Sequence, residues 1–193
     1  MLKKKHIYEH YMPKKNEVMV RDKLPLKFFT QPDLTSCSIT CLAYAFGLYY
    51  YNDYDNSSVI REYCRLDLAF FDYFGYDING LGQYGEKVTK EGCYINEFSG
   101  FMKSEGIIHE RIDPNDVHNA IDEHFPVLGG LKSYMGVENA GHEVLIVGYD
   151  SNDNNSFCCM GPYTGTYETH SANEFHDLYM YKYEGYLTPL DKK

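Results

Sequence analysis

The chain of 193 residues is long enough to bury one sizeable core and short for two, so its length favours a single domain. Its 44% hydrophobic and 24% charged residues are typical of a globular protein, and no run of about 18 apolar residues suggests a membrane span. A formal net charge of -10 argues against nucleic acid as the main partner, because Lys and Arg provide most of the affinity for phosphate backbones.

The cysteines and histidines favour a reducing compartment without a metal site. The basic cluster at residues 3–5 is not followed by an apolar stretch, so we expect no signal peptide and a cytoplasmic location. Most of the six cysteines are then expected to be small buried apolar residues. No CxxC pair and no zinc-like His spacing occur, so the sequence predicts no metal and no organic cofactor. It carries no signal for an oligomeric state.

The predicted elements place helices before strands. Residues 1–25 are expected to form a polar arm with one short strand at 17–20, and residues 26–193 a single domain that opens with an extended stretch at 26–30 and a loop at 31–36. Helices are expected over 37–51, 57–71, 93–106 and 116–125, and strands over 107–112, 126–131, 143–150, 156–160 and 178–183. This order predicts an α+β fold with an N-terminal helical lobe packed on a twisted antiparallel sheet, and a cleft between the two lobes.

The joint between loop and first helix places a thiol at a helix N-terminus. In "FFTQPDLTSCSITCLAYAFGLYY", residues 28–50, Pro32 and Asp33 favour a turn, and apolar residues recur at helical spacing from Cys37 onward. The helix dipole and the unpaired N–H groups stabilise negative charge, so we expect Cys37 to ionise more easily than a free cysteine. Cys41, one turn further on, is expected to be structural.

Two further residues could complete an acyl-transfer site with Cys37. Gln31 precedes it by six positions, and its amide together with the Cys37 N–H could stabilise an oxyanion. In "NAGHEVLIVGYD", residues 139–150, His142 enters a predicted strand directly after a glycine. An imidazole beside a thiol is the usual activating arrangement in cysteine catalysis, and the order of Cys before His is the expected one.

Three blocks of the sequence together resemble papain-like cysteine peptidases. "QPDLTSCSITCLAYAFGLYY", "DPNDVHNAIDEHFPVLGGL" and "GHEVLIVGYD" are similar to those of the branch that includes the bacteriocin-processing peptidases, which cut after double-glycine leaders. The similarity extends roughly over residues 26–187. The resemblance implies a papain-like fold in which Cys37 is the nucleophile, His142 the general base and acid, and Gln31 the oxyanion donor.

The third catalytic position departs from the family pattern. The family usually places an Asp or Asn before a proline, where it orients the imidazole; here "FCCMGPYTG" has Gly161 before Pro162. Three explanations are open. A nearby residue of the loop after the His strand could reach the imidazole, the candidates being Asp150, Asn152, Asp153 and Asn154. A backbone carbonyl, a water or the Tyr163 hydroxyl could orient it instead, or turnover could be lost.

The expected function is thiol-dependent hydrolysis of a peptide or amide bond through an acyl-enzyme on Cys37. The same Cys and His pair also supports deamidation and acyl or γ-glutamyl transfer, and the fold does not choose among these reactions. A pseudo-peptidase that binds peptides without cleaving them is the alternative that Gly161 suggests.

Overall fold

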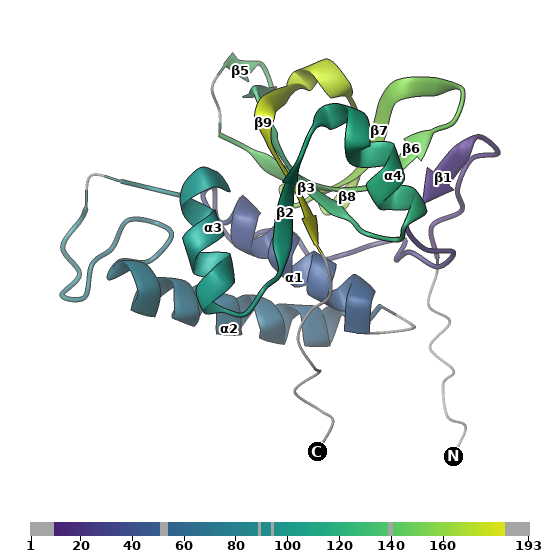
Figure 1. The fold of residues 1–193 in the computed structure, drawn as a ribbon. Helices are drawn as coiled ribbons and strands as arrows, with labels where there is room; N and C mark the ends of the chain where they lie inside the picture. The colour runs from purple at the N-terminus through teal and green to yellow at the C-terminus, as the bar shows by residue number, and fades with distance from the viewer. Residues whose placement is uncertain (1–9, 51–53, 89, 94, 139–140, 184–193) are drawn as a thin grey trace, which may run out of the picture.

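The computed structural model describes residues 10–50, 54–88, 90–93, 95–138 and 141–183, and its architecture is a helical layer packed on an antiparallel sheet (Figure 1). The helices are α1 (Cys37–Tyr50), α2 (Asn56–Phe74), α3 (Ile95–Ser104) and α4 (Val117–Asp122), with short 3-10 turns η1 (Pro114–Asp116) and η2 (Ala172–Glu174). Figure 1 shows α1, α2 and α3 gathered on one side of the sheet. The α+β fold class expected from the sequence is confirmed.

One seven-stranded sheet forms the second layer. Its strands are β1 (Glu17–Met19), β2 (His109–Ile112), β3 (Val127–Leu131), β6 (Glu143–Asp150), β7 (Asp153–Gly161), β8 (Thr166–Ser171) and β9 (Phe175–Tyr183). The order is β2-β9-β3-β6-β7-β8, all neighbours are antiparallel, and β1 pairs with the end of β6. A separate small hairpin joins β4 (Ser133–Tyr134) to β5 (Val137–Glu138).

The first helix is the centre of the core. All seven of its residues from 39 to 45 have no exposed surface, and Thr40 is the one among them that is not hydrophobic. A helix that is apolar on all sides must be covered on all sides, and α1 packs against α2 on one side and against β6 on the other. This packing fixes the N-terminus of α1 against the start of β6.

The second helix shows the amphipathic pattern that its sequence predicts. Val59, Tyr63, Leu66 and Phe70 are buried at spacings of three and four. Its N-cap is Asp55, whose carboxylate accepts hydrogen bonds from the N–H groups of the first turn. The helix therefore begins one residue earlier than predicted and runs three residues further.

Two other predictions differ from the structure in detail. The helix expected over 116–125 is divided into η1 and the short α4, and Asp113 caps the turn by accepting a hydrogen bond from Asn115 N (3.0 Å). The strand β8 was not predicted, because "TYETHS" lacks an alternation of apolar residues. It is the edge strand of the sheet, where polar side chains reduce the risk of pairing with other chains.

Candidate active site

Cys37 is the first residue of α1, and its sulfur packs against the backbone that carries His142. A turn closed by Asp33, whose carboxylate accepts hydrogen bonds from Thr35 N (2.9 Å) and Thr35 Oγ1 (3.1 Å), leads the chain into the helix. The Cys37 Sγ lies 3.9 Å from the carbonyl oxygen of Gly141, the residue before His142. The predicted nucleophile and the segment that carries the predicted base therefore meet where α1 and β6 begin.

Burial changes the expected ionisation of Cys37. The residue is only 7% exposed, and burial raises the pKa of its thiol to about 12, with Glu143 adding to the rise. Backbone N–H groups of Glu143, Ser38 and Cys37 itself lower this pKa, but by less. The expectation that Cys37 ionises more easily than a free cysteine is therefore wrong for this structure, because desolvation outweighs the helix terminus.

His142 is held by the backbone and by an aromatic ring. Gly141 has a φ of 62°, a left-handed conformation that glycine adopts without steric cost, and it turns the chain into β6. Leu131 N donates to the His142 carbonyl (2.8 Å), and the ring of Tyr134 stacks on the imidazole with centroids 3.8 Å apart and 25° between the planes. No group in the described part of the chain hydrogen-bonds to the buried Nε2 of His142. The ring is thus fixed in place while one nitrogen lacks a partner.

The imidazole of His142 is neutral at pH 7. Burial lowers its pKa to about 4; the carboxylate of Glu168 acts to raise this pKa and His170 to lower it further, but burial dominates. A neutral imidazole has one nitrogen that can accept a proton. A neutral imidazole and a protonated thiol carry no charges, so burial is compatible with both groups in these states.

Gln31 lies between the start of α1 and the end of β7. Its backbone N–H donates to the carbonyl of Pro162 (2.7 Å), and its Nε2 donates to the carbonyl of Asp33 (2.5 Å), so the side chain is held over the turn that precedes Cys37. The residue is 8% exposed, and its Oε1 is buried with no hydrogen-bond partner among the described residues. An amide nitrogen carries two N–H groups, so the bond to Asp33 uses one of them.

The described side chains of the loop after β6, those of Asp150, Asn152 and Asp153, lie far from His142. β6 rises by about 3.3 Å per residue, so its end at Asp150 lies on the order of 25 Å from His142. The Asp150 carboxylate instead accepts a hydrogen bond from Asn152 N (2.8 Å), and Asp153 pairs with Asp150 across the hairpin. That explanation of the missing acid is wrong for these residues, and the side chain of Asn154 lies outside the described residues.

Tyr163 follows Gly161 and Pro162 at the end of β7. It is 41% exposed, and its ring contacts that of Tyr134 edge-on, with centroids 6.2 Å apart. Tyr163 therefore packs against the ring of Tyr134, which in turn stacks on the imidazole of His142.

Sequence reasoning missed Glu168 in β8, whose carboxylate is linked to His142 through Tyr134 and acts on the pKa of the imidazole. Its Oε1 accepts hydrogen bonds from Tyr134 OH (2.9 Å) and Thr164 Oγ1 (2.7 Å), and its Oε2 accepts one from His170 Nε2 (3.1 Å). Burial favours the protonated form of Glu168, but these hydrogen bonds outweigh it and lower the pKa, so the group is ionised at neutral pH.

A signal for Glu168 is present in the sequence once the hairpin is recognised. The turn "PYTG", residues 162–165, sets Gly161 opposite Thr166, and the next same-face position of the strand is Glu168. Gly165 closes this turn by donating its N–H to the Gly161 carbonyl (2.9 Å). An acidic residue two positions beyond the partner of Gly161 is therefore a diagonal neighbour of the glycine.

The model of the Peptidase_C39 like family matches residues 23–188, a range that includes Gln31, Cys37 and His142. The chain belongs to this family. The resemblance drawn from the three sequence blocks is thereby confirmed, and membership of the C39-like family supports a cysteine peptidase-like function with peptide substrates. No curated protein sequence matches the chain significantly.

Among solved structures, the C39-like chain is similar to the peptidase domain of Streptococcus ComA, a bifunctional ABC transporter involved in a quorum-sensing pathway. The TM-score is 0.49 and the sequence identity 15%, with 81% of this chain and 96% of the other covered.

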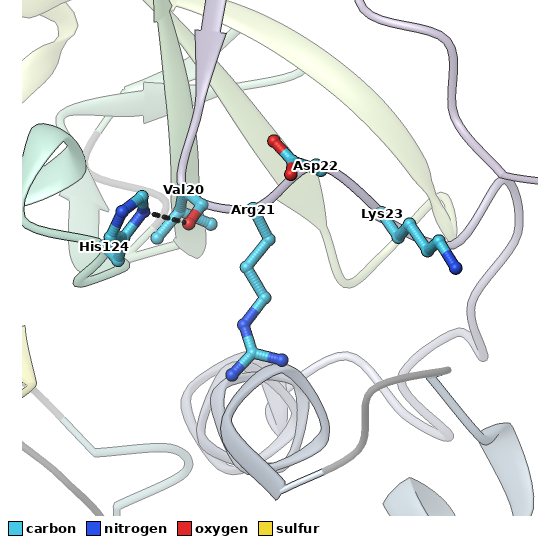
Figure 2. Close-up of a pocket in the computed structure, with 5 residues that line it drawn as sticks. All are labelled: Val20, Arg21, Asp22, Lys23 and His124. Atoms are coloured by element: carbon cyan, nitrogen blue, oxygen red, sulfur yellow. Dashed lines mark hydrogen bonds between the residues drawn. The ribbon is translucent and has the colours of Figure 1, made fainter.

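A surface pocket of the C39-like domain lies away from the candidate site. It has a volume of about 690 Å³ and is lined by Val20, Arg21, Asp22, Lys23 and His124 (Figure 2). Figure 2 shows Arg21 pointing to the end of a helix, where its guanidinium donates to the carbonyl of Tyr49 (3.2 Å). Because Cys37 begins α1 and Tyr49 is near its end, the pocket and the thiol are about 18 Å apart along the helix. Arg21 stabilises the helix C-terminus there.

Among the residues that the structure describes, no helix has both the length and the apolar composition that a membrane span requires. Those residues also contain no group of three or more His, Cys, Asp or Glu side chains arranged to hold a metal ion. All six cysteines are free thiols.

Proposed function

We propose that this C39-like chain hydrolyses a peptide or amide bond through an acyl-enzyme on Cys37. The observation that carries the proposal is the packing of the Cys37 sulfur, 3.9 Å from the carbonyl of Gly141, beside the segment that holds His142. Gln31 stands over the same helix start, held by Asp33 and Pro162. The proposed nucleophile, base and oxyanion donor thus come from three segments, and their contacts support the proposal.

The chemistry follows from these positions. The Cys37 sulfur bonds to the substrate carbonyl carbon while its proton passes to the imidazole of His142, and the oxyanion is stabilised by the Gln31 amide and the Cys37 N–H. The imidazolium then protonates the leaving amine, the C–N bond breaks, and a thioester remains. Water, losing a proton to His142, attacks the thioester and restores the Cys37 thiol.

The resting state suits proton transfer during attack. Burial holds the Cys37 thiol protonated, with its pKa raised to about 12, and the His142 imidazole neutral, with its pKa lowered to about 4. The thiolate would be unstable in this site without a group to receive its proton. Reactivity of Cys37 should therefore depend on His142 far more than on the pH of the solution.

Alkylation by iodoacetamide at pH 7, followed by mass spectrometry, tests the proposal with an internal control. Cys64 is exposed, whereas Cys37 is buried, so accessibility alone predicts that Cys64 is labelled first. An activated site reverses this order, and His142→Ala slows the labelling of Cys37 while leaving Cys64 unchanged. Slower labelling of Cys37 than of Cys64, with no effect of His142→Ala, would contradict the proposal and favour a peptide-binding pseudo-peptidase.

Product analysis separates hydrolysis from the other reactions of a thioester. Incubation with a mixture of short unprotected peptides should release new amino termini, and Cys37→Ala, which keeps the helix but removes the sulfur, should release none. Products that form only when an amine acceptor is added would indicate acyl transfer, and a mass gain of one unit in an intact peptide would indicate deamidation.

A further inference from the structure

Glycine at position 161 leaves room for the carboxylate of Glu168. A Cβ added at this position would lie 2.1 Å from Glu168 Oε1 and 2.4 Å from Glu168 Cδ, far inside contact distance. The φ of Gly161 does not fall in the left-handed region, so the backbone would accept another residue type. The space next to Gly161, where the family usually places its acid, is thus filled by a carboxylate from the neighbouring strand.

Three hydrogen bonds hold that carboxylate in place. Tyr134 OH and Thr164 Oγ1 donate to Oε1, and His170 Nε2 donates to Oε2. The other ring nitrogen of His170 is hydrogen-bonded to Glu174 Oε2 (3.1 Å), which fixes the ring between two carboxylates. An ionised carboxylate has about four acceptor positions, so one remains open on Glu168.

The imidazole of His142 likewise has an unused hydrogen-bonding position. Its Nε2 is buried, and no described residue hydrogen-bonds to it. Tyr134 joins the two groups, since its ring stacks on the imidazole and its hydroxyl donates to Glu168. A buried ring N–H without an acceptor is unfavourable, so it should be drawn to the nearest open acceptor.

We propose that Glu168 is the positioning residue of His142, taking from β8 the role that the family gives to a side chain at position 161. This inference rests on the proposed function and names the third member of its site. In the working geometry the His142 Nε2–H donates to Glu168, so the unprotonated Nδ1 accepts the proton of Cys37 during attack. Glu168 then stabilises the imidazolium until the leaving amine takes the proton.

The charges around His142 agree with this role. The carboxylate of Glu168 in β8 acts to raise the pKa of His142. His170, whose protonation Glu168 and Glu174 favour, is the other charged group that acts on the ring. Burial lowers the pKa of His170, but the hydrogen bonds to the two carboxylates outweigh it and raise the pKa. A net negative charge on this cluster at neutral pH favours a positive charge on His142 during catalysis.

Moving the carboxylate between the strands tests the proposal. Glu168→Ala should slow alkylation of Cys37 by about 10- to 100-fold, whereas Glu168→Gln, which keeps an acceptor oxygen, should lose less. Gly161→Asp alone places a side chain against Glu168 and should be as slow as Glu168→Ala. Gly161→Asp combined with Glu168→Ala restores an acid in vacated space and should recover most of the rate. Circular dichroism of each variant shows that the fold persists.

The His142 ring gives a second readout that does not need an active enzyme. Titration of its ¹⁵N signals should show a lower pKa in Glu168→Gln than in the wild type, and in the wild type a proton on Nε2 in the neutral state. If wild-type Cys37 is alkylated ahead of Cys64 but the Glu168 variants match the wild type in both readouts, the positioning role is overturned and the peptidase proposal stands. If wild-type Cys37 is not alkylated ahead of Cys64, the peptidase proposal fails. In that case, a His142 pKa that is equal in the wild type and in Glu168→Gln would also overturn the role of Glu168.

Discussion

The ring of Tyr134 lies flat on the imidazole of His142, with the two centroids 3.8 Å apart. This contact covers one face of the imidazole and contributes to the burial that keeps it neutral. The same tyrosine donates its hydroxyl proton to Glu168 Oε1, so one residue limits both the tilt of the His142 ring and the position of the carboxylate. Tyr134 comes from the small β4–β5 hairpin, outside the main sheet.

Truncation of Tyr134 should therefore release His142. In Tyr134→Ala we expect the pKa of His142 to rise from about 4 toward its usual value near 6.5, because solvent replaces the stacked ring and the desolvation that dominates the shift is reduced. Tyr134→Phe is the matched control: it keeps the stacked ring, removes the hydrogen bond to Glu168, and should leave this pKa close to the wild-type value. Imidazole titration by NMR measures both, and equal pKa values in all three proteins would contradict the assignment.

Substitution of Gly161 should cost stability only when Glu168 is present. Gly161→Ala inserts a methyl group into space held by the carboxylate, and we expect a loss of about 1–3 kcal/mol in the free energy of unfolding. In a Glu168→Ala background the same change should be nearly neutral. Urea denaturation of the four proteins measures the coupling between positions 161 and 168. An equal loss of stability in both backgrounds would show that a side chain at 161 does not clash with Glu168.

The sequence was sufficient for the main architecture and for the meeting of Cys37 with the His142 segment. Helical periodicity and the apolar strand after His142 are strong patterns that survive in the fold, because both elements are buried on nearly every side. The loop at 31–36 could also be predicted, since Asp33 forms a turn that its sequence favours.

Long-range pairing is what sequence patterns did not supply. Glu168 lies on a polar edge strand, and its proximity to Gly161 depends on the register of β7 with β8. Tyr134 lies on a hairpin of two-residue strands, too short for a periodic signal. The ionisation of Cys37 was mispredicted for a different reason: the helix terminus is local and visible in the sequence, whereas desolvation depends on everything that packs over the sulfur.

Glu143, next to His142, should make stability depend on pH. The residue is 3% exposed, its Oε2 has no partner among the described residues, and burial raises its pKa well above 4.5. A pKa that is higher in the folded state means that the unfolded chain loses this proton first as pH rises, so stability should fall from about pH 4.5 upward.

Glu143→Gln removes this titration and keeps the size of the side chain. We expect the variant to be more stable than the wild type by about 1–3 kcal/mol at pH 8 and of similar stability at pH 4, where the wild-type carboxyl is protonated in both states. Urea denaturation at the two pH values measures the difference. A wild type that equals or exceeds the variant at pH 8 would mean that Glu143 is ionised and stabilised by a group in the folded protein.

The role of Gln31 can be separated from that of the thiol by choosing two probes. A peptide aldehyde such as acetyl-Gly-glycinal adds to Cys37 and forms a tetrahedral oxyanion or its hydroxyl, whereas iodoacetamide reacts by displacement and forms none. Gln31→Ala should therefore weaken aldehyde binding by about 10²-fold and leave the alkylation rate nearly unchanged.

The Gln31 amide also holds the turn through Asp33, so a control for the turn is needed. Asp33→Ala keeps the backbone carbonyl that accepts from Gln31 Nε2 but removes the carboxylate that bonds Thr35. This variant reports the effect of a loosened turn alone. If Gln31→Ala reduces aldehyde affinity and alkylation rate equally, and Asp33→Ala does the same, then Gln31 supports the turn and does not stabilise the oxyanion.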